Sequence, residues 1–351
     1  MKKKISEIDF IKTILALGII CFHYACHIKC KKKYVYKSRG STYGFLFTNI
    51  FWLISGALHY YNNSNIKSIK YFYFKKFKAL APSYYILFIY RYFKKVFITG
   101  KFFFSELSPF YLIYSFLLID GYMYYFGIKA FNMLVGEWFL GALIIIYLFY
   151  PILLYGFKYF FIQTFLINIF FFSFFFHGEY FKFQEKNLII CIILFFEGMI
   201  IIKYINLNNI FTLIFSIFIL IIYYFVNIPL NKPFLIDVLF SPFFFVFLFW
   251  VGKLIMKIKI FNKIISKIAL ISYQIFLLQH LVIYKILYYF PKALTNKIYF
   301  CILFLCIIIT IFLAYILHLL SIKFIQSKIF IDFETWILND NKNNINYNKL
   351  K

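Results

Sequence analysis

The stretch FIKTILALGIICFHYACH, residues 10–27, has the length and apolar character of a membrane-spanning helix. Further apolar runs follow, and none alternates with polar residues, which favours helices over a membrane β-barrel. These runs lie at about 43–61, 79–98, 107–119, 138–156, 159–176, 188–203, 210–228, 234–252, 269–290 and 298–321. We therefore expect an all-α integral membrane protein, a polytopic bundle of about 10–11 transmembrane helices. The run at 107–119 is the weakest candidate because it is short, and we expect it to be either re-entrant or interfacial.

The composition supports a membrane protein and argues against nucleic-acid binding. Of the 351 residues, 64% are hydrophobic and 26% are aromatic, and the mean hydropathy is +0.83. The formal net charge of +26 comes almost entirely from lysine, since Arg39 and Arg91 are the only arginines. Most lysines flank apolar runs, where they anchor helices at the membrane interface. We therefore expect membrane lipids, and no nucleic acid, as partners.

The chain is expected to form one transmembrane domain and a short tail. The connections between apolar runs are short and leave no room for a soluble domain. The segment 322–340 has the pattern of an amphipathic interfacial helix, and an Asn- and Lys-rich end follows it. We therefore expect a transmembrane domain at residues 1–326, and an interfacial helix with a disordered polar tail at 327–351. The polar ISEID segment before the first apolar run indicates a retained helix rather than a cleaved signal peptide.

The six cysteines are scattered and form neither a CxxC pair nor a zinc-ligand spacing. Five of them lie in or beside apolar runs, where cysteine commonly serves as a small apolar residue. We therefore expect no metal site.

Ionisable residues of the first run share one face. On a helix with about 100° per residue, Lys12 lies at about −60°, His23 at about −40° and His27 at about 0° relative to Asp9. Ionisable groups inside a membrane usually face the bundle interior or a watery cavity and are functional candidates. Asp9 and Lys12 lie near the helix end, so they could also pair with each other, and His27 could lie at the far interface. His23 is one turn deeper, which makes it the strongest candidate.

This polar stripe resembles a known family. The segment IDFIKTILALGIICFH, residues 8–23, is similar to the opening helix of the acyltransferase family 3 membrane proteins. That helix has an Asp, then Arg or Lys, then ten residues and a His. Asp9, Lys12 and His23 match this spacing.

Four later segments resemble landmarks of the same family in the same order. They are FWLISGALHYY (51–61), YFKKFKALAPSYY (73–85), EWFLGALIIIYLFYPIL (137–153) and ISYQIFLLQHLVIY (271–284). Together with the first helix they cover roughly residues 5–320. The family favours arginine in the second of these segments, where this chain has lysines, and Ala79 stands at a position that is often arginine.

The resemblance implies a bacterial O-acyltransferase, in most members an O-acetyltransferase of cell-surface sugars. It implies acetyl-CoA, or another acyl-CoA, as a cytoplasmic co-substrate and no permanently bound cofactor. The donor phosphates need cations, which Lys12 and the cluster Lys75, Lys76 and Lys78 supply as point charges, since lysine lacks the planar fork of arginine. His23 lies about 16 Å along the helix axis from Lys12, a gap that a pantetheine arm can bridge. His23 is therefore our candidate general base, although a covalent acyl-histidine is also compatible with it.

Other polar residues are candidates for the acceptor site or a cavity. Ser55 and His59 lie four residues apart on the second run, although Ser55 is equally suited to helix packing beside Gly56. Glu197 lies well inside a run, so the cost of burying a carboxylate in lipid marks it for function. The remaining candidates are Glu137 and Trp138 at the edge of a run, where interfacial anchoring is the alternative, and Tyr273 and His280 on a late run.

The expected orientation in the membrane rests on the number of spans between two groups of lysines rather than on the positive-inside rule. The first loop is as basic as the N-terminal segment, so the positive-inside rule does not decide. Two predicted spans separate Lys12 from Lys75, Lys76 and Lys78, which places these lysines on one side. We therefore expect a multi-pass protein of the bacterial inner membrane with a cytoplasmic N-terminus.

Two other functions compete with the sugar O-acyltransferase. One is a transporter or flippase for polysaccharide intermediates, in which the polar stripe lines a conduction path. The other is a structural partner in an envelope assembly. Transporters often consist of two related halves with interrupted helices, and the sequence has no such symmetry. The spacing from Lys12 to His23 favours the enzyme, which would take a sugar or glycolipid acceptor. The sequence indicates no oligomeric state.

Overall fold

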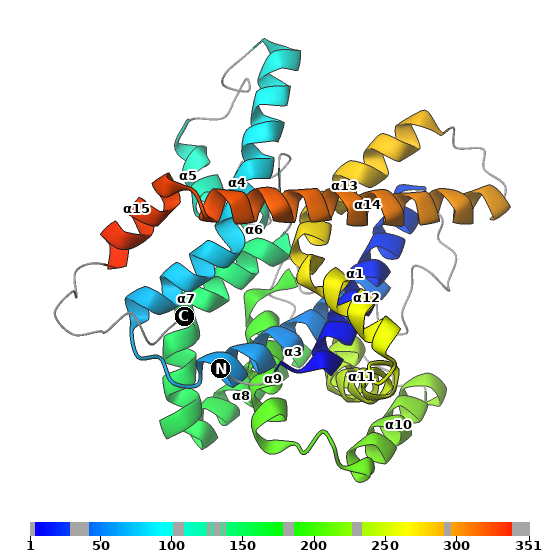
Figure 1. Cartoon of the computed structure of the whole chain (residues 1–351). Helices are drawn as coiled ribbons and strands as arrows, with labels where there is room; N and C mark the ends of the chain where they lie inside the picture. Colours follow the sequence, from blue (N-terminus) through cyan, green and yellow to red (C-terminus); the bar gives the residue numbers. More distant parts are fainter. Residues whose placement is uncertain are drawn as a thin grey trace.

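The chain forms a bundle of helices in the computed structural model, which describes residues 4–28, 42–100, 109–124, 128, 135, 138–177, 186–226, 234–290 and 296–338. Within these residues all regular structure is helical and no strand occurs (Figure 1). A 3₁₀ turn spans Pro109–Tyr111. The α-helices are α1 (Ser6–His27), α3 (Tyr43–Asn63), α4 (Ile69–Thr99), α5 (Leu112–Phe116), α6 (Asp120–Met123), α7 (Trp138–Tyr159), α8 (Phe161–His177), α9 (Leu188–Tyr204), α10 (Ile210–Phe225), α11 (Phe234–Ile255), α12 (Lys259–Leu270), α13 (Ser272–Tyr289), α14 (Asn296–Ile325) and α15 (Lys328–Leu338).

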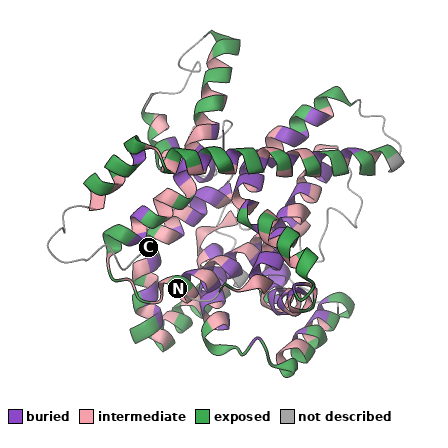
Figure 2. Ribbon diagram, in the orientation of Figure 1, coloured by how far each residue is buried: buried purple, intermediate pink, exposed green. Residues whose placement is uncertain are grey.

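The apolar exterior confirms a multi-pass membrane protein. Among the described helices, α1, α7, α11 and α14 are long and apolar enough to cross a membrane, and the bent pair α12 and α13 gives a fifth span if counted as one. Large apolar side chains are exposed along α8, α10 and α14, such as Phe170, Phe218 and Phe312. Figure 2 shows this exposed surface around a buried centre. A soluble protein rarely exposes such extensive apolar surface, whereas lipid covers it at no cost.

The predicted apolar runs coincide with helices, with one exception. The run at 107–119 contains only the 3₁₀ turn and the five-residue helix α5 in its described part, so it is not a spanning helix. Among the described residues, four helices, or five with the bent pair, are long and apolar enough to cross a membrane, whereas ten or eleven spans were expected. Helix α12 was not predicted, because its sequence KIFNKIISKIAL is strongly amphipathic rather than uniformly apolar. It meets α13 at a bend of 69°.

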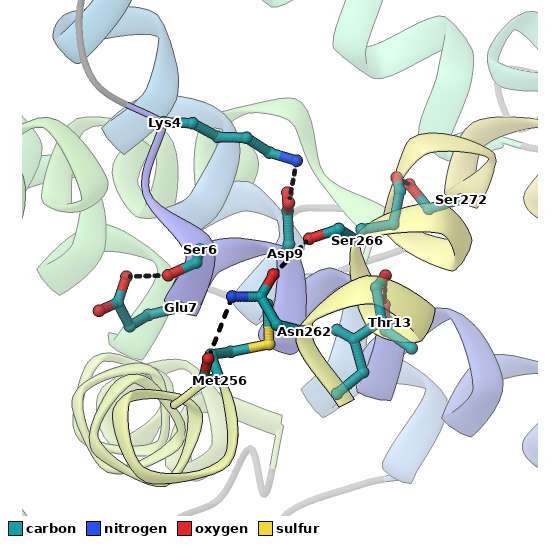
Figure 3. Close-up of polar contacts among 11 residues, drawn as sticks. Lys4, Ser6, Glu7, Asp9, Thr13, Met256, Asn262, Ser266 and Ser272 are labelled. Carbon is teal, nitrogen blue, oxygen red and sulfur yellow. Dashed lines mark hydrogen bonds and ion pairs between the residues drawn. The ribbon is translucent and has the colours of Figure 1, made fainter. Parts of the chain in front are cut away.

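Helix α1 lies at the centre of the bundle and packs against α3, α11, α12, α13 and α14 (Figure 1). Its apolar residues Ile11, Leu15 and Ile20 are fully buried. Figure 3 shows the polar contacts at its first turns. There the Lys4 ammonium lies 2.5 Å from the Asp9 carboxylate, and the Thr13 hydroxyl donates to the Ile265 carbonyl of α12 at 3.1 Å. These contacts and the buried face together fix the rotation of α1 about its own axis.

The closest helix pair in the core is α3 with α9, and glycines permit this approach. A Cβ on Gly56 would lie 1.8 Å from the Phe195 carbonyl oxygen, and one on Gly198 would lie 2.0 Å from the Leu53 carbonyl oxygen. Small residues at helix crossings allow backbones in a membrane to come into contact. The glycines therefore determine the distance between α3, which contributes Ser55 and His59, and its neighbour.

A buried carboxylate joins the short helices α5 and α6 to α4. Asp120 at the start of α6 accepts hydrogen bonds from the Tyr84 hydroxyl of α4 and the Ser115 hydroxyl of α5, each at 3.0 Å. It also accepts from the Gly121 backbone amide at 2.8 Å. Because buried carboxylates require such partners, this cluster ties α5 and α6 to α4.

Candidate active site

The ionisable residues predicted to form one stripe on α1 have different partners in the structure. Asp9 pairs with Lys4, not with Lys12. Lys12 is half-buried, and no acidic group among the described residues lies within ion-pair distance of it. His23 and His27, near the far end of α1, are also half-buried and face α13. The stripe therefore has an amine near one end of the helix and imidazoles near the other.

Three histidines meet between α1 and α13. The ring centroids of His23 and His280 are 4.1 Å apart. The Nε2 atom of His27 lies 3.2 Å from the Nδ1 atom of His280, a hydrogen bond in which one nitrogen donates and the other accepts. The structure thus brings together His23 and His280, which the sequence placed on separate helices. Within the described residues no group of three or more His, Cys, Asp or Glu side chains is arranged to hold a metal ion.

His23 lines a cavity of about 220 Å³ at its end of the bundle. The wall of this cavity combines aromatic and polar side chains from α1, α3, α7 and α13 and from residue 186, which precedes α9. They include Phe22, Thr48, Trp138, Lys186 and Phe276. The Lys186 ammonium lies 5.8 Å from the ring centroid of Trp138. Trp138, a predicted acceptor-site residue, therefore shares a cavity with the predicted base.

A second cavity, of about 180 Å³, lies next to the His23 cavity, and Ile19, Thr48 and Phe276 form part of both walls. Two predicted residues line it, Ser55 of α3 and Tyr273 of α13. The Tyr273 hydroxyl donates to the Leu80 carbonyl of α4 at 3.1 Å, so its hydrogen is engaged in joining two helices. We call this space the central cavity.

A third cavity, of about 370 Å³, is lined by Lys76 and shares Leu80 and Tyr147 with the central cavity. Its other walls come from α4, α7 and the segment 116–119 that Asp120 holds in place. The Lys76 ammonium lies 5.2 Å from the ring centroid of Tyr147 and 5.3 Å from that of Phe72. We call this space the Lys76 cavity.

The three lysines predicted to act together on α4 point to different surroundings. Lys76 faces its cavity, whereas Lys75 is exposed. Lys78 Nζ lies 2.6 Å from the Glu334 carboxylate of α15 and 5.8 Å from the Phe330 ring centroid. Adjacent positions on a helix are about 100° apart, so three lysines within one turn cannot all face one cavity.

His59 lies beside the Lys76 cavity. Its Nδ1 donates to the Ser55 carbonyl at 2.8 Å, and its ring packs against Tyr147 at a centroid distance of 4.1 Å and an interplanar angle of 36°. Its Nε2 is buried and has no hydrogen-bond partner among the described residues.

Glu197 does not join this group. Glu197 lines a separate cavity of about 180 Å³ between α8, α9 and α11, together with Asn168 and apolar residues. Glu137 lies outside the described residues.

Three residues with a place in these walls were not predicted as site residues. Tyr147 borders both the central and the Lys76 cavity, and Thr48 and Lys186 line the His23 cavity. Tyr147 and Thr48 are polar groups inside long apolar runs, which is the signal that identifies them. Lys186 gives no such signal, because lysines beside apolar runs are common in this sequence.

The charge distribution along the cavities suits an anionic, elongated ligand. Among the described lining residues of the three spaces none is acidic, and Lys76 stands at one end and Lys186 at the other. His23 contributes an imidazole to one of these spaces, and imidazole is the side chain that enzymes use most often for proton transfer. These spaces lie among the helices of an all-α polytopic membrane protein.

Comparison with protein families identifies the class. A family model described as an acyltransferase domain, that of acyltransferase family 3, matches residues 5–319. The chain therefore belongs to acyltransferase family 3, and it is an acyltransferase of the membrane. No match was found among curated proteins or among solved structures.

Proposed function

We propose that this acyltransferase is an O-acyltransferase that uses a cytoplasmic acyl-CoA, with acetyl as the transferred group. The acceptor is a hydroxyl of a cell-surface or lipid-linked sugar. The observation that supports this most is the row of adjoining cavities with Lys76 at one end and His23 at the other. A phosphate-bearing donor with a long arm matches this order of groups.

Lys76 contacts the donor phosphates inside its cavity, and Lys12, Lys75 and Lys78 add positive charge around it. The central cavity, whose wall is mostly apolar, holds the pantetheine arm. The thioester then lies beside His23, at the far end of a helix whose Lys12-to-His23 separation is about 16 Å. The donor is a co-substrate in this scheme and not a resident cofactor.

His23 is the general base. Its imidazole removes the proton from the acceptor hydroxyl while the hydroxyl oxygen attacks the thioester carbonyl carbon. The tetrahedral intermediate collapses by breaking the carbon–sulfur bond, and the leaving thiolate takes the proton from the His23 imidazolium. The products are an ester and the free thiol of coenzyme A, so His23 returns to its neutral state. Confinement of both substrates in one cavity supplies proximity.

The His23 cavity receives the acceptor. The Trp138 ring offers an apolar face for a sugar, and the Thr48 oxygen and the Lys186 ammonium offer polar partners. Since the donor enters from the side of Lys76, the acceptor enters from the opposite side. This arrangement has a cytoplasmic N-terminus in the bacterial inner membrane.

Mass spectrometry of the surface glycan from a strain that lacks the gene tests the proposal. We expect the glycan in normal quantity without its acetyl mass increments, and their return when the wild-type gene is restored. Restoration with the His318→Ala gene should also return the acetyl groups, because His318 lies on α14 outside the three cavities. Loss of the glycan itself, with unchanged acetylation of what remains, contradicts the proposal and supports a transporter.

A further inference from the structure

The contact between His23 and His280 gives the base a partner from a second helix. Their ring centroids are 4.1 Å apart with an interplanar angle of 56°, so atoms of the two rings are in contact. His23 lines the cavity that we assign to the acceptor, whereas His280 is absent from the described lining of that cavity. His280 therefore stands behind the base rather than beside the substrate.

His280 is itself held in place. His27, one helical turn beyond His23 on α1, has its Nε2 3.2 Å from His280 Nδ1. The His27 ring also packs on Tyr284 of α13, at a centroid distance of 4.2 Å. Residues four apart on a helix lie on the same face, so His23 and His27 both face α13. The His280 ring is thus located by a hydrogen bond on one side and by His23 on the other.

We propose that His280, oriented by its hydrogen bond to His27, is a positioning residue that holds the His23 ring for proton transfer. This inference rests on the proposed function of His23. A base must approach its proton within hydrogen-bond reach, and displacement by about 1 Å costs about 100-fold in rate. A second imidazole in contact with the ring also stabilises the imidazolium that His23 becomes during the reaction. Both effects act on turnover and not on binding of the donor.

The test compares three substitutions of His280 in membrane vesicles from cells that carry the native acceptor. His280→Ala removes the ring, His280→Phe keeps a planar ring without nitrogen, and His280→Asn keeps a polar atom near the Nδ1 position. The rate of transfer from radiolabelled acetyl-CoA is measured against donor concentration and normalised to the amount of extracted, monodisperse protein. His318→Ala is again the matched control, since it removes a histidine from another membrane helix.

We expect His280→Ala and His280→Phe to lower kcat about 100-fold with a donor KM within about twofold of wild type. His280→Asn is expected to recover at least about tenfold of that loss, because it can still bond to His27. His27→Ala is expected to lower kcat about tenfold and to add little in combination with His280→Ala, since the two act through one contact.

Two results would overturn the inference. One is a wild-type kcat for His280→Ala or His280→Phe while His23→Ala is inactive. This result would leave the assignment of His23 as the base intact. The other is an active His23→Ala protein, which removes both the base and the residue that positions it. The activity of His23→Ala thus separates failure of this inference from failure of the proposed function.

Discussion

Lys78 of α4 and Glu334 of α15 form an ion pair with 2.6 Å between the ammonium and the carboxylate. This pair, together with the contact of Lys78 with the Phe330 ring, fastens α15 against the first turns of α4. Lys76, two positions earlier, faces the opposite way into a cavity beside Tyr147. The basic stretch of α4 thus has one lysine that faces the interior and one that docks the C-terminal helix.

Lys76 is expected to contribute more to donor binding than its neighbour Lys75. Loss of a charged hydrogen-bond partner costs about 1.5 kcal/mol or more, so Lys76→Gln should raise the donor KM at least about tenfold. Lys75→Gln is the matched control, because Lys75 is exposed and adjacent in sequence. Initial rates against acetyl-CoA concentration at about pH 6 give both values. A larger effect of Lys75→Gln contradicts the assignment.

Donor binding should depend on pH through Lys76. Burial, and secondly the charge of Lys75, lowers the pKa of the Lys76 amine to about 7. The charged form that binds phosphate is therefore present below this pH and is lost above it. The donor KM is expected to increase between about pH 6 and about pH 8, and in Lys75→Gln the increase should move to higher pH, because a repulsive charge is gone. A donor KM that is constant over this range is the opposing result.

The ion pair between Lys78 and Glu334 should contribute little free energy of unfolding. The two side chains retain 34% and 28% of their exposure, so we expect a coupling below about 1 kcal/mol. A double-mutant cycle with Lys78→Gln and Glu334→Gln, followed by thermal unfolding in detergent, measures it. Lys78→Gln is also expected to raise the donor KM less than Lys76→Gln does. Equal increases in KM would show that both lysines contact the donor.

The contact between α3 and α9 should tolerate no side chain at Gly56. Its Cβ would lie 1.8 Å from the Phe195 carbonyl oxygen, and a backbone atom cannot rotate away. Gly56→Ala should therefore lower the free energy of unfolding by about 1–3 kcal/mol. Gly156→Ala on α7 is the control, because its new Cβ meets the end of the Thr164 side chain at 2.7 Å, which can move. Equal unfolding midpoints in detergent for the two variants contradict this explanation.

Much of the fold could be predicted because the position and length of each apolar run can be read directly from the sequence. The helices follow the apolar runs, and the run at 10–28 forms α1. Helix α12 escaped prediction because its lysines and Asn262 interrupt the apolar pattern. The run at 107–119 was too short to assign, and its described conformation depends on Asp120 bonding to Tyr84, a contact between segments.

The site could be predicted only in part, since it depends on how helices pack. Spacing alone placed Lys12 and His23 on one face of α1. The proximity of His280 to His23 depends on the packing of α13 against α1, which no periodicity within either helix specifies. The different directions of Lys76 and Lys78 follow from helix geometry, but the pairing of Lys78 with Glu334 depends on the packing of α15.

The most direct test of the account is acetyl transfer by the His23→Ala protein in membrane vesicles that carry the native acceptor. The central claim is that His23 removes the proton from the acceptor hydroxyl. We expect the rate to fall by at least about 100-fold, with unchanged membrane insertion and a donor KM within about twofold of wild type. The His318→Ala protein in parallel should transfer acetyl at the wild-type rate. Transfer by His23→Ala at the rate of the His318→Ala control would contradict the claim.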